Sequence, residues 1–158
     1  MAVNDIHVAT ASDFQEVLEW LKEERDRGED GFFCNREIIA KSFGAGEGLC
    51  TICEGKIVGF AVFQFFIDSG DVQIIEVHQS FRRKGLGAKL LGAAVGALCG
   101  LGAMYIDVEC TSREGEALCR SYGFEEFFDP QNFRGEWDNP TLRLYFSDWR
   151  PSPPHPWA

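Results

Sequence analysis

Hydrophobic and polar residues alternate along this chain with two periods, one typical of strands and one typical of helices. Two-residue alternation and short apolar runs predict strands, which occupy 6–10, 49–53, 57–67, 72–78, 105–110, 124–128 and 142–146. Apolar residues at helical spacing predict helices in 14–21, 35–43, 86–101 and 113–122. The predicted order is β-α-α-β-β-β-α-β-α-β-β, which places the chain in the α/β class.

Turn and capping residues set the boundaries of these elements. Ser12 and Asp13 are predicted to cap the first helix, which fades in the polar run 23–31, and Gly44 is predicted to close the second. Glu54-Gly55-Lys56 predicts a hairpin, and Ser69-Gly70-Asp71 predicts another turn before the strand that follows.

Length and composition indicate one globular unit. The chain has 158 residues, so we expect a single domain over 1–150 and a proline-rich tail over 151–158. No apolar run is long enough to cross a membrane, and Asn4, Asp5 and His7 stand where a signal peptide would be apolar. The six cysteines lack the spacing of a metal site, so the sequence predicts reduced thiols, no metal and a cytoplasmic protein.

The stretch from Ile74 to Leu91 passes from a strand through a basic turn into an apolar helix. Arg82, Gly85 and Gly87 stand across that turn in an R-x-x-G-x-G spacing. Glycines let a ligand approach the backbone, and the new helix offers unpaired N–H groups to an anion. The turn is therefore predicted to hold phosphate. A Walker loop is absent, and the dinucleotide pattern G-x-G-x-x-G/A fails because its last position is Leu90.

This turn resembles the pyrophosphate loop of the GNAT superfamily of acyl-CoA N-acyltransferases, whose pattern is Q/R-x-x-G-x-G/A. A second stretch, 107–124, resembles the family's downstream segment and matches it at Ala117, Leu118, Gly123 and Phe124. Two positions depart from that segment: Ser112 replaces an asparagine, and Cys119 replaces a tyrosine that is credited with protonating the leaving thiolate. The resemblance implies the GNAT fold, a mixed sheet with helices on both faces.

The resemblance also implies a donor and a donor site. Acetyl-CoA would place its pantetheine between the strand ending at His78 and the strand of Asp107. The Val77 backbone N–H would be the oxyanion donor, and backbone N–H groups of the turn would hold the pyrophosphate. The residues expected to bind the donor are Val77, Arg82, Arg83, Lys84, Gly85, Leu86, Gly87 and Ala88.

Acyl transfer to an amine needs a proton acceptor, and three residues are candidates. Glu76 and His78 share one face of their strand by two-residue periodicity, and His78 has an ordinary pKa close to neutral. Asp107 occupies the place where several protein N-terminal acetyltransferases carry a basic glutamate. Cys119 is the candidate proton donor to the thiolate, although a buried inert thiol, with the acid supplied by water, is the preferred interpretation.

The formal net charge of −10 argues against binding to nucleic acid or to an anionic membrane. We therefore predict an N-acetyltransferase for a cationic primary amine, either a small molecule or a protein side chain. The acidic residues expected beside the acceptor are Glu23, Glu24, Asp26, Glu29, Asp30, Glu125, Glu126, Asp129, Glu136 and Asp138. The alternatives are a non-catalytic acyl-CoA-binding module and a tRNA-acetylating toxin of the same fold. A homodimer is a further expectation from the family.

Overall fold

The computed structural model describes residues 5–29, 31–127 and 139–146. The sequence also predicts a loop over 133–140, of which 133–138 lie outside these residues, as does the proline-rich tail. The strands are β1 (Asp5–Val8), β2 (Gly48–Cys53), β3 (Lys56–Phe66), β4 (Ser69–Val77), β5 (Tyr105–Glu109), β6 (Glu125–Glu126) and β7 (Thr141–Tyr145). The helices are α1 (Ala11–Asp26), α2 (Arg36–Gly44), α3 (Leu86–Gly100) and α4 (Arg113–Tyr122), with 3-10 turns η1 (Phe33–Asn35) and η2 (Gln79–Phe81). This order confirms the predicted α/β class.

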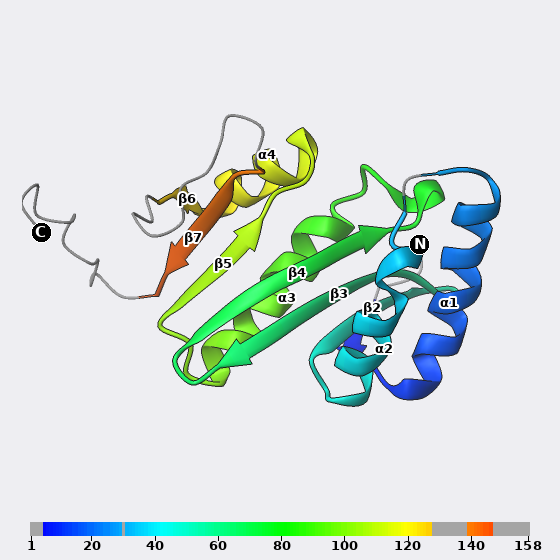
Figure 1. The fold of residues 1–158 in the computed structure, drawn as a ribbon, viewed down its shortest axis with the longest axis horizontal. Helices are drawn as coiled ribbons and strands as arrows, with labels where there is room; N and C mark the ends of the chain where they lie inside the picture. Colours follow the sequence, from blue (N-terminus) through cyan, green and yellow to red (C-terminus); the bar gives the residue numbers. More distant parts are fainter. Residues whose placement is uncertain (1–4, 30, 128–138, 147–158) are drawn as a thin grey trace, which may run out of the picture.

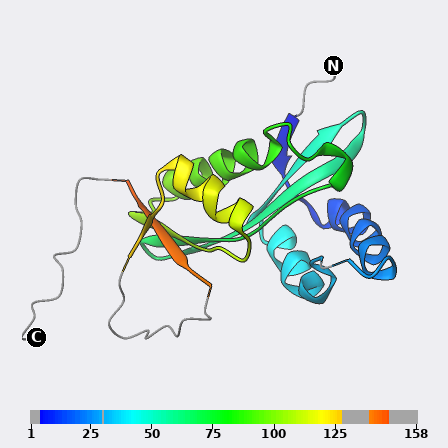
Figure 2. The ribbon, with the colours of Figure 1, turned by 90° about the horizontal axis from the view of Figure 1, so that it is seen from above.

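The described strands form one mixed sheet in the order β1-β2-β3-β4-β5-β7-β6. Its pairs are antiparallel except for β4 and β5, which run parallel because α3 crosses over between them. Figure 1 shows the sheet from its broad side, and Figure 2 shows α1 and α2 on one face with α3 and α4 on the other. No helix in the described part of the chain is long and apolar enough to cross a membrane.

Two apolar clusters, one on each face, hold the layers together. On the α3 face, Leu90, Leu91 and Leu98 of the helix are fully buried against the sheet. On the α1 face, Trp20 packs edge-on against Phe60 of β3 with ring centroids 5.4 Å apart. Because strand residues alternate between faces, β4 carries Ile74 in the α1-side cluster and Ile75 against the α3-side cluster. This alternation decides which β4 side chains face α1.

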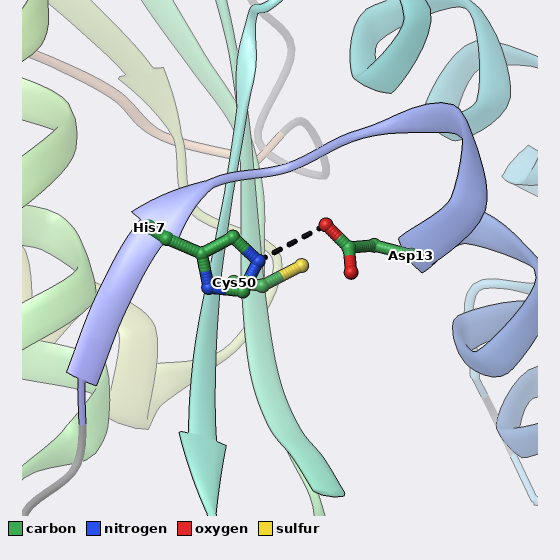
Figure 3. Close-up of side chains that lie close together, drawn as sticks. All are labelled: His7, Asp13 and Cys50. Atoms are coloured by element: carbon green, nitrogen blue, oxygen red, sulfur yellow. Dashed lines mark hydrogen bonds and ion pairs between the residues drawn. The ribbon is translucent and has the colours of Figure 1, made fainter. Parts of the chain in front are cut away.

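The cap of α1 differs from the prediction. Thr10 is the N-cap, and Asp13 is the third helical residue, whose carboxylate returns to the Thr10 backbone N–H at 2.9 Å. Asp13 also accepts a hydrogen bond from His7 of β1 at 3.0 Å, and the Cys50 thiol of β2 lies beside them (Figure 3). Burial raises the pKa of the Cys50 thiol to about 12, so the thiol is neutral at pH 7. This cluster fixes the start of α1 at the β1 edge of the sheet, away from β4 and β5.

Two glycine assignments were also wrong. The left-handed residue after α2 is Gly46, with φ of 75°, and Gly44 is helical. Ser69-Gly70-Asp71 belongs to β4, and the turn precedes it at 67–68. Gly70 serves packing instead, because a Cβ there would clash with the Leu98 side chain of α3.

The feature that positions the site is the separation of β4 from β5. The two strands pair only over Ser69–Val72 and Tyr105–Val108. Beyond that point β4 continues to Val77 while still paired with β3, and β5 turns away toward α4. Figure 1 shows the two strands diverging toward their carboxyl ends. Among the described strands, the second half of β4 therefore has one edge without a partner.

Candidate active site

A cavity of about 600 Å³ lies between the diverging strands. We call it the main cavity. It is lined by Ile75, Glu76 and Val77 of β4, by Cys110 and Ser112 after β5, and by Leu118 and Cys119 of α4. The turn before α3 closes its far end. An extended ligand could enter here and hydrogen-bond to the free edge of β4, as a strand does when it is added to a sheet.

The Val77 amide points into this cavity. On a strand, consecutive amides point to opposite edges. The His78 N–H donates to the Val58 carbonyl of β3 at 2.7 Å, which fixes that amide toward β3. The Val77 N–H therefore faces the opposite edge, as does its carbonyl, which accepts a hydrogen bond from Arg82. A carbonyl oxygen placed in the main cavity beside β4 would meet the Val77 N–H as a donor.

The turn before α3 has the backbone geometry of an anion cradle. Arg83 and Gly85 both have positive φ, at 63° and 79°, a conformation that turns successive N–H groups toward one concave side. Gly85 is the N-cap of α3, and no side chain in the described chain caps this end. The first N–H groups of α3 therefore remain available, and the helix dipole favours a negative charge above them.

Most of the predicted donor-binding residues line the main cavity. Those that do so are Val77, Arg82, Arg83, Gly85, Leu86 and Gly87. Lys84 and Ala88 are not among the lining residues, and the Lys84 ammonium lies 5.2 Å from the centre of the Phe81 ring. Both are exposed on the outer side of the turn.

Arg82 has partners on β4. Its Nε donates to the Val77 carbonyl at 3.0 Å, and its Nη2 donates to Glu76 Oε1 at 3.1 Å. The guanidinium is thus directed at the strand, whereas the sequence predicts that Arg82 binds the donor. In this position it ties the turn to the strand and places a positive charge beside Glu76.

Glu76 has the environment of a proton acceptor. Its side chain is 11% exposed, and it lies on the α1 face of β4 at the wall of the main cavity. Burial, followed by the negative charge of Glu24 on α1, raises the pKa of the Glu76 carboxyl to about 7, although Arg82 opposes the shift. A carboxylate with a pKa near the working pH is suited to general base catalysis.

His78 lies against Trp20 of α1 and is not among the residues that line the main cavity. Its Nδ1 accepts a hydrogen bond from the Ser80 N–H at 3.2 Å, which caps η2. The ring contacts Trp20 and Phe81, with centroids 5.3 and 6.2 Å away. These contacts give His78 a structural role at the end of β4.

The structure does not bring Asp107 to the main cavity. Asp107 lies where β4 and β5 are still paired, opposite Asp71. Both of its carboxylate oxygens accept hydrogen bonds from Arg143 of β7, at 2.6 and 3.0 Å. The guanidinium of Arg143 stacks on Tyr105 and Phe127 at about 4 Å. Asp107 is therefore part of an ion pair between strands, and its geometry argues against a role as base.

Cys119 lines the main cavity beside Cys110. The two thiols are buried and interact with each other. Burial raises the pKa of the Cys119 thiol to about 12, so the group is protonated and a poor nucleophile at neutral pH. The sequence does not predict Cys110 at this site, because a cysteine at the end of a strand has the pattern of an ordinary apolar residue.

Two of the acidic residues that were expected beside the acceptor lie near Glu76 in the structure. Glu24 and Glu29 line a second, smaller cavity together with Glu76. Glu125 and Glu126 form β6 at the far edge of the sheet, and Glu126 contacts Arg120. Asp30, Asp129, Glu136 and Asp138 lie outside the described residues.

Comparison with known families agrees with this geometry. The family model described as acetyltransferase (GNAT) domain matches residues 46–126, which include β2 to α4 and thus the turn and the main cavity. The chain therefore belongs to the GNAT acetyltransferase family, a class of acetyl-CoA-dependent N-acetyltransferases. A search of curated proteins gives no significant match.

Solved structures of this class share the fold over nearly the whole chain. PaiA N-acetyltransferase from Thermoplasma acidophilum, in complex with coenzyme A, is similar with a TM-score of 0.70 and 11% identity, over 91% of this chain and 99% of that one. Polyamine N-acetyltransferase from Drosophila melanogaster, which forms N-acetylagmatine, gives 0.71 and 12%, over 90% and 100%. Diaminobutyrate acetyltransferase EctA from Paenibacillus lautus, with its substrate and coenzyme A, gives 0.66 and 20%, over 95% and 100%.

Proposed function

We propose that this protein transfers an acetyl group from acetyl-CoA directly to a primary amine, with both substrates bound together. The observation that carries the proposal is the unpaired edge of β4, which places the Val77 N–H, the Glu76 carboxyl and the turn before α3 around one cavity. The pyrophosphate would bind at Gly85 and Gly87, and the pantetheine would lie along β4.

Two groups of the protein divide the chemistry, and water carries the last proton. Glu76 accepts the proton of the amine, which must be neutral to attack the thioester carbonyl. The Val77 N–H donates to the oxyanion that forms on that carbonyl. The carbon–sulfur bond then breaks, the acetyl group stays on the nitrogen, and the CoA thiolate leaves. The nitrogen loses its second proton, which passes through water to the thiolate. The chain thus needs no side-chain acid.

Cys119→Ala is expected to leave kcat and KM close to their wild-type values. The thiol is buried and protonated, and a thiolate leaving group departs without help from a strong acid. Steady-state kinetics with one amine measures the effect, and Cys110→Ala is the matched control in the same wall. A loss confined to kcat in Cys119→Ala alone would assign the thiol a part in protonating the leaving group.

The proposal is tested by release of CoA thiol from acetyl-CoA in the presence of a panel of primary amines. The account predicts amine-dependent release with formation of the N-acetylated amine. Tight binding of acetyl-CoA without release by any amine would instead identify a non-catalytic acyl-CoA-binding module. Release of CoA thiol only when aminoacyl-tRNA is the acceptor would favour a tRNA-acetylating toxin.

The acceptor is proposed to be cationic. The support is the pair of carboxylates from Glu24 and Glu29 beside Glu76, together with a net charge of −10. A negative wall attracts a cationic amine and repels partners rich in phosphate. Two structural neighbours act on acceptors of this kind, one forming N-acetylagmatine and the other using diaminobutyric acid.

A further inference from the structure

A second cavity of about 290 Å³ adjoins the main cavity on its α1 side. We call it the acidic chamber. Its lining residues are Glu24, Glu29, Glu76, Gln79 and Arg82. Glu76 and Arg82 also line the main cavity, so the two spaces meet at the Glu76 side chain. A molecule that reacts at Glu76 therefore lies next to the acidic chamber.

Glu24 is the unusual member of this chamber. It is 4% exposed, which is rare for a carboxylate unless it is paired. Its Oε1 accepts a hydrogen bond from the Trp20 indole N–H. Its Oε2 is buried and accepts no hydrogen bond from an N–H group or hydroxyl of the described chain. The Glu76 carboxyl group in the chamber is close enough to share a proton with Glu24 but brings no positive charge. A buried carboxylate oxygen without a donor is costly, and a bound cation would remove that cost.

The position of Glu24 is fixed in advance by its surroundings. Gly31, after the end of α1, lies so close that a Cβ on it would clash with Glu24 Oε2. The Trp20 ring that holds Oε1 is itself packed against Phe60. The carboxylate is thus held between α1 and the following backbone, as a preorganised binding group requires.

The charges around the chamber leave one carboxylate without a cation. Glu29 pairs with Arg27 at 3.0 Å, and this hydrogen bond lowers the pKa of Glu29. Glu76 pairs with Arg82 at 3.1 Å. The described chain provides no ion pair of this kind for Glu24. The chamber therefore has room and charge for one more positive group.

We infer that the acidic chamber binds a second cationic group of the acceptor, so that the acceptor is a short diamine or an amino-guanidine. This inference rests on the proposed acetyl transfer to an amine. One nitrogen reacts in the main cavity at Glu76, and the other binds between Glu24 and Glu29. Because Glu76 lines both cavities, the reacting nitrogen and the second cationic group lie on opposite sides of its carboxyl group. With one hydrogen bond on each side, the two groups are about 6–8 Å apart, a distance that an aliphatic chain of about four or five carbons spans.

The test compares two acceptors that differ only in the second charge. 1,4-Diaminobutane carries the second ammonium, and 4-amino-1-butanol replaces it with a neutral hydroxyl of similar size. We expect kcat/KM for the diamine to be higher by at least about 30-fold, within the range measured for close charge pairs. The acetyl-CoA concentration is kept saturating, so that only acceptor recognition differs.

Three variants locate the source of that preference. Glu24→Gln is expected to reduce it to a few-fold, and Glu29→Gln to reduce it in part, each with unchanged affinity for acetyl-CoA. Glu19→Gln is the matched control, because Glu19 is an exposed glutamate of α1 whose partner is Lys22. If Glu24→Gln fails to fold in a thermal melt, the exposed Glu29→Gln still decides the question.

The possible outcomes distinguish a failure of this inference from a failure of the proposed acetyl transfer. Equal kcat/KM for the two acceptors, with both acetylated, would overturn the acidic chamber as a cation site and leave amine acetylation standing. A preference that persists in Glu24→Gln and Glu29→Gln would also overturn it. No acetylated product from any amine, with acetyl-CoA still bound, would overturn the proposed function itself.

Discussion

Gly87→Glu is expected to abolish acetyl-CoA binding while the protein still unfolds cooperatively. Gly87 lies in the first turn of α3, at the wall of the main cavity, and a Cβ there would meet only Leu118 at 3.5 Å. The backbone thus tolerates a side chain. The glutamate carboxylate would instead lie where the pyrophosphate is proposed to bind. It would repel the pyrophosphate, since bringing two like charges together costs several kcal/mol. We expect the affinity to fall by at least about 100-fold, or roughly 2.7 kcal/mol.

Gly96→Glu is the matched control for this change. Gly96 belongs to the same helix, is exposed and has open space around it, and the substitution adds the same charge away from the turn. Calorimetric titration with acetyl-CoA should give the wild-type affinity for Gly96→Glu and no measurable binding for Gly87→Glu. Unchanged affinity in Gly87→Glu would remove the turn before α3 from the donor site.

Glu76→Gln is expected to lower kcat by about 100-fold, the low end for loss of a general base. The amide keeps the size of the side chain but cannot accept the proton. In the wild type, kcat/KM should rise as the pH rises through about 7, because Glu76 must be ionised and its pKa is about 7. This acidic limb should disappear in Glu76→Gln and remain in His78→Ala. If His78→Ala loses the limb instead, the proton acceptor is His78.

The same substitution is expected to stabilise the protein at high pH. The Glu76 carboxyl has a pKa near 7 when folded and an ordinary value of 4.5 when exposed. Its contribution to stability is therefore fully present below pH 4.5 and is lost as the pH rises through 7. Glu76→Gln removes this loss, worth on the order of 3 kcal/mol above pH 7.

Thermal melts of the two proteins measure that difference directly. The melting temperature of Glu76→Gln should exceed that of the wild type at pH 8, and the two should converge near pH 4. A wild type that is the more stable protein at pH 8 would show that the Arg82 ion pair outweighs the burial of Glu76.

The parts of this account that depend on local sequence were predictable. Gly85 must adopt a left-handed conformation, and a helix that begins without a cap leaves its N–H groups free. Both properties belong to neighbouring residues, so the sequence around Arg82 predicted the cradle before any tertiary structure. The two-residue period of β4 also predicts that Glu76 and His78 share one face of the strand.

The parts that depend on contacts between distant segments were not predictable. Glu24 is one of ten acidic residues that the sequence places beside the acceptor without distinguishing among them, and only the packing of α1 on β4 buries it beside Glu76. Asp107 was misjudged because its partner Arg143 lies 36 residues away. Gly70 was assigned to a turn because close contact with Leu98 leaves no signal in the local pattern.

The central claim is direct transfer between substrates bound at the unpaired edge of β4. Mass measurement of a single turnover tests it most directly, with the protein mixed with one equivalent of acetyl-CoA in the presence or absence of 1,4-diaminobutane. Without the amine we predict unmodified protein and intact acetyl-CoA. With it we predict one acetylated amine for each CoA thiol released. An acetyl group found on Cys110 or Cys119 without the amine, or no product with the amine, would contradict the account.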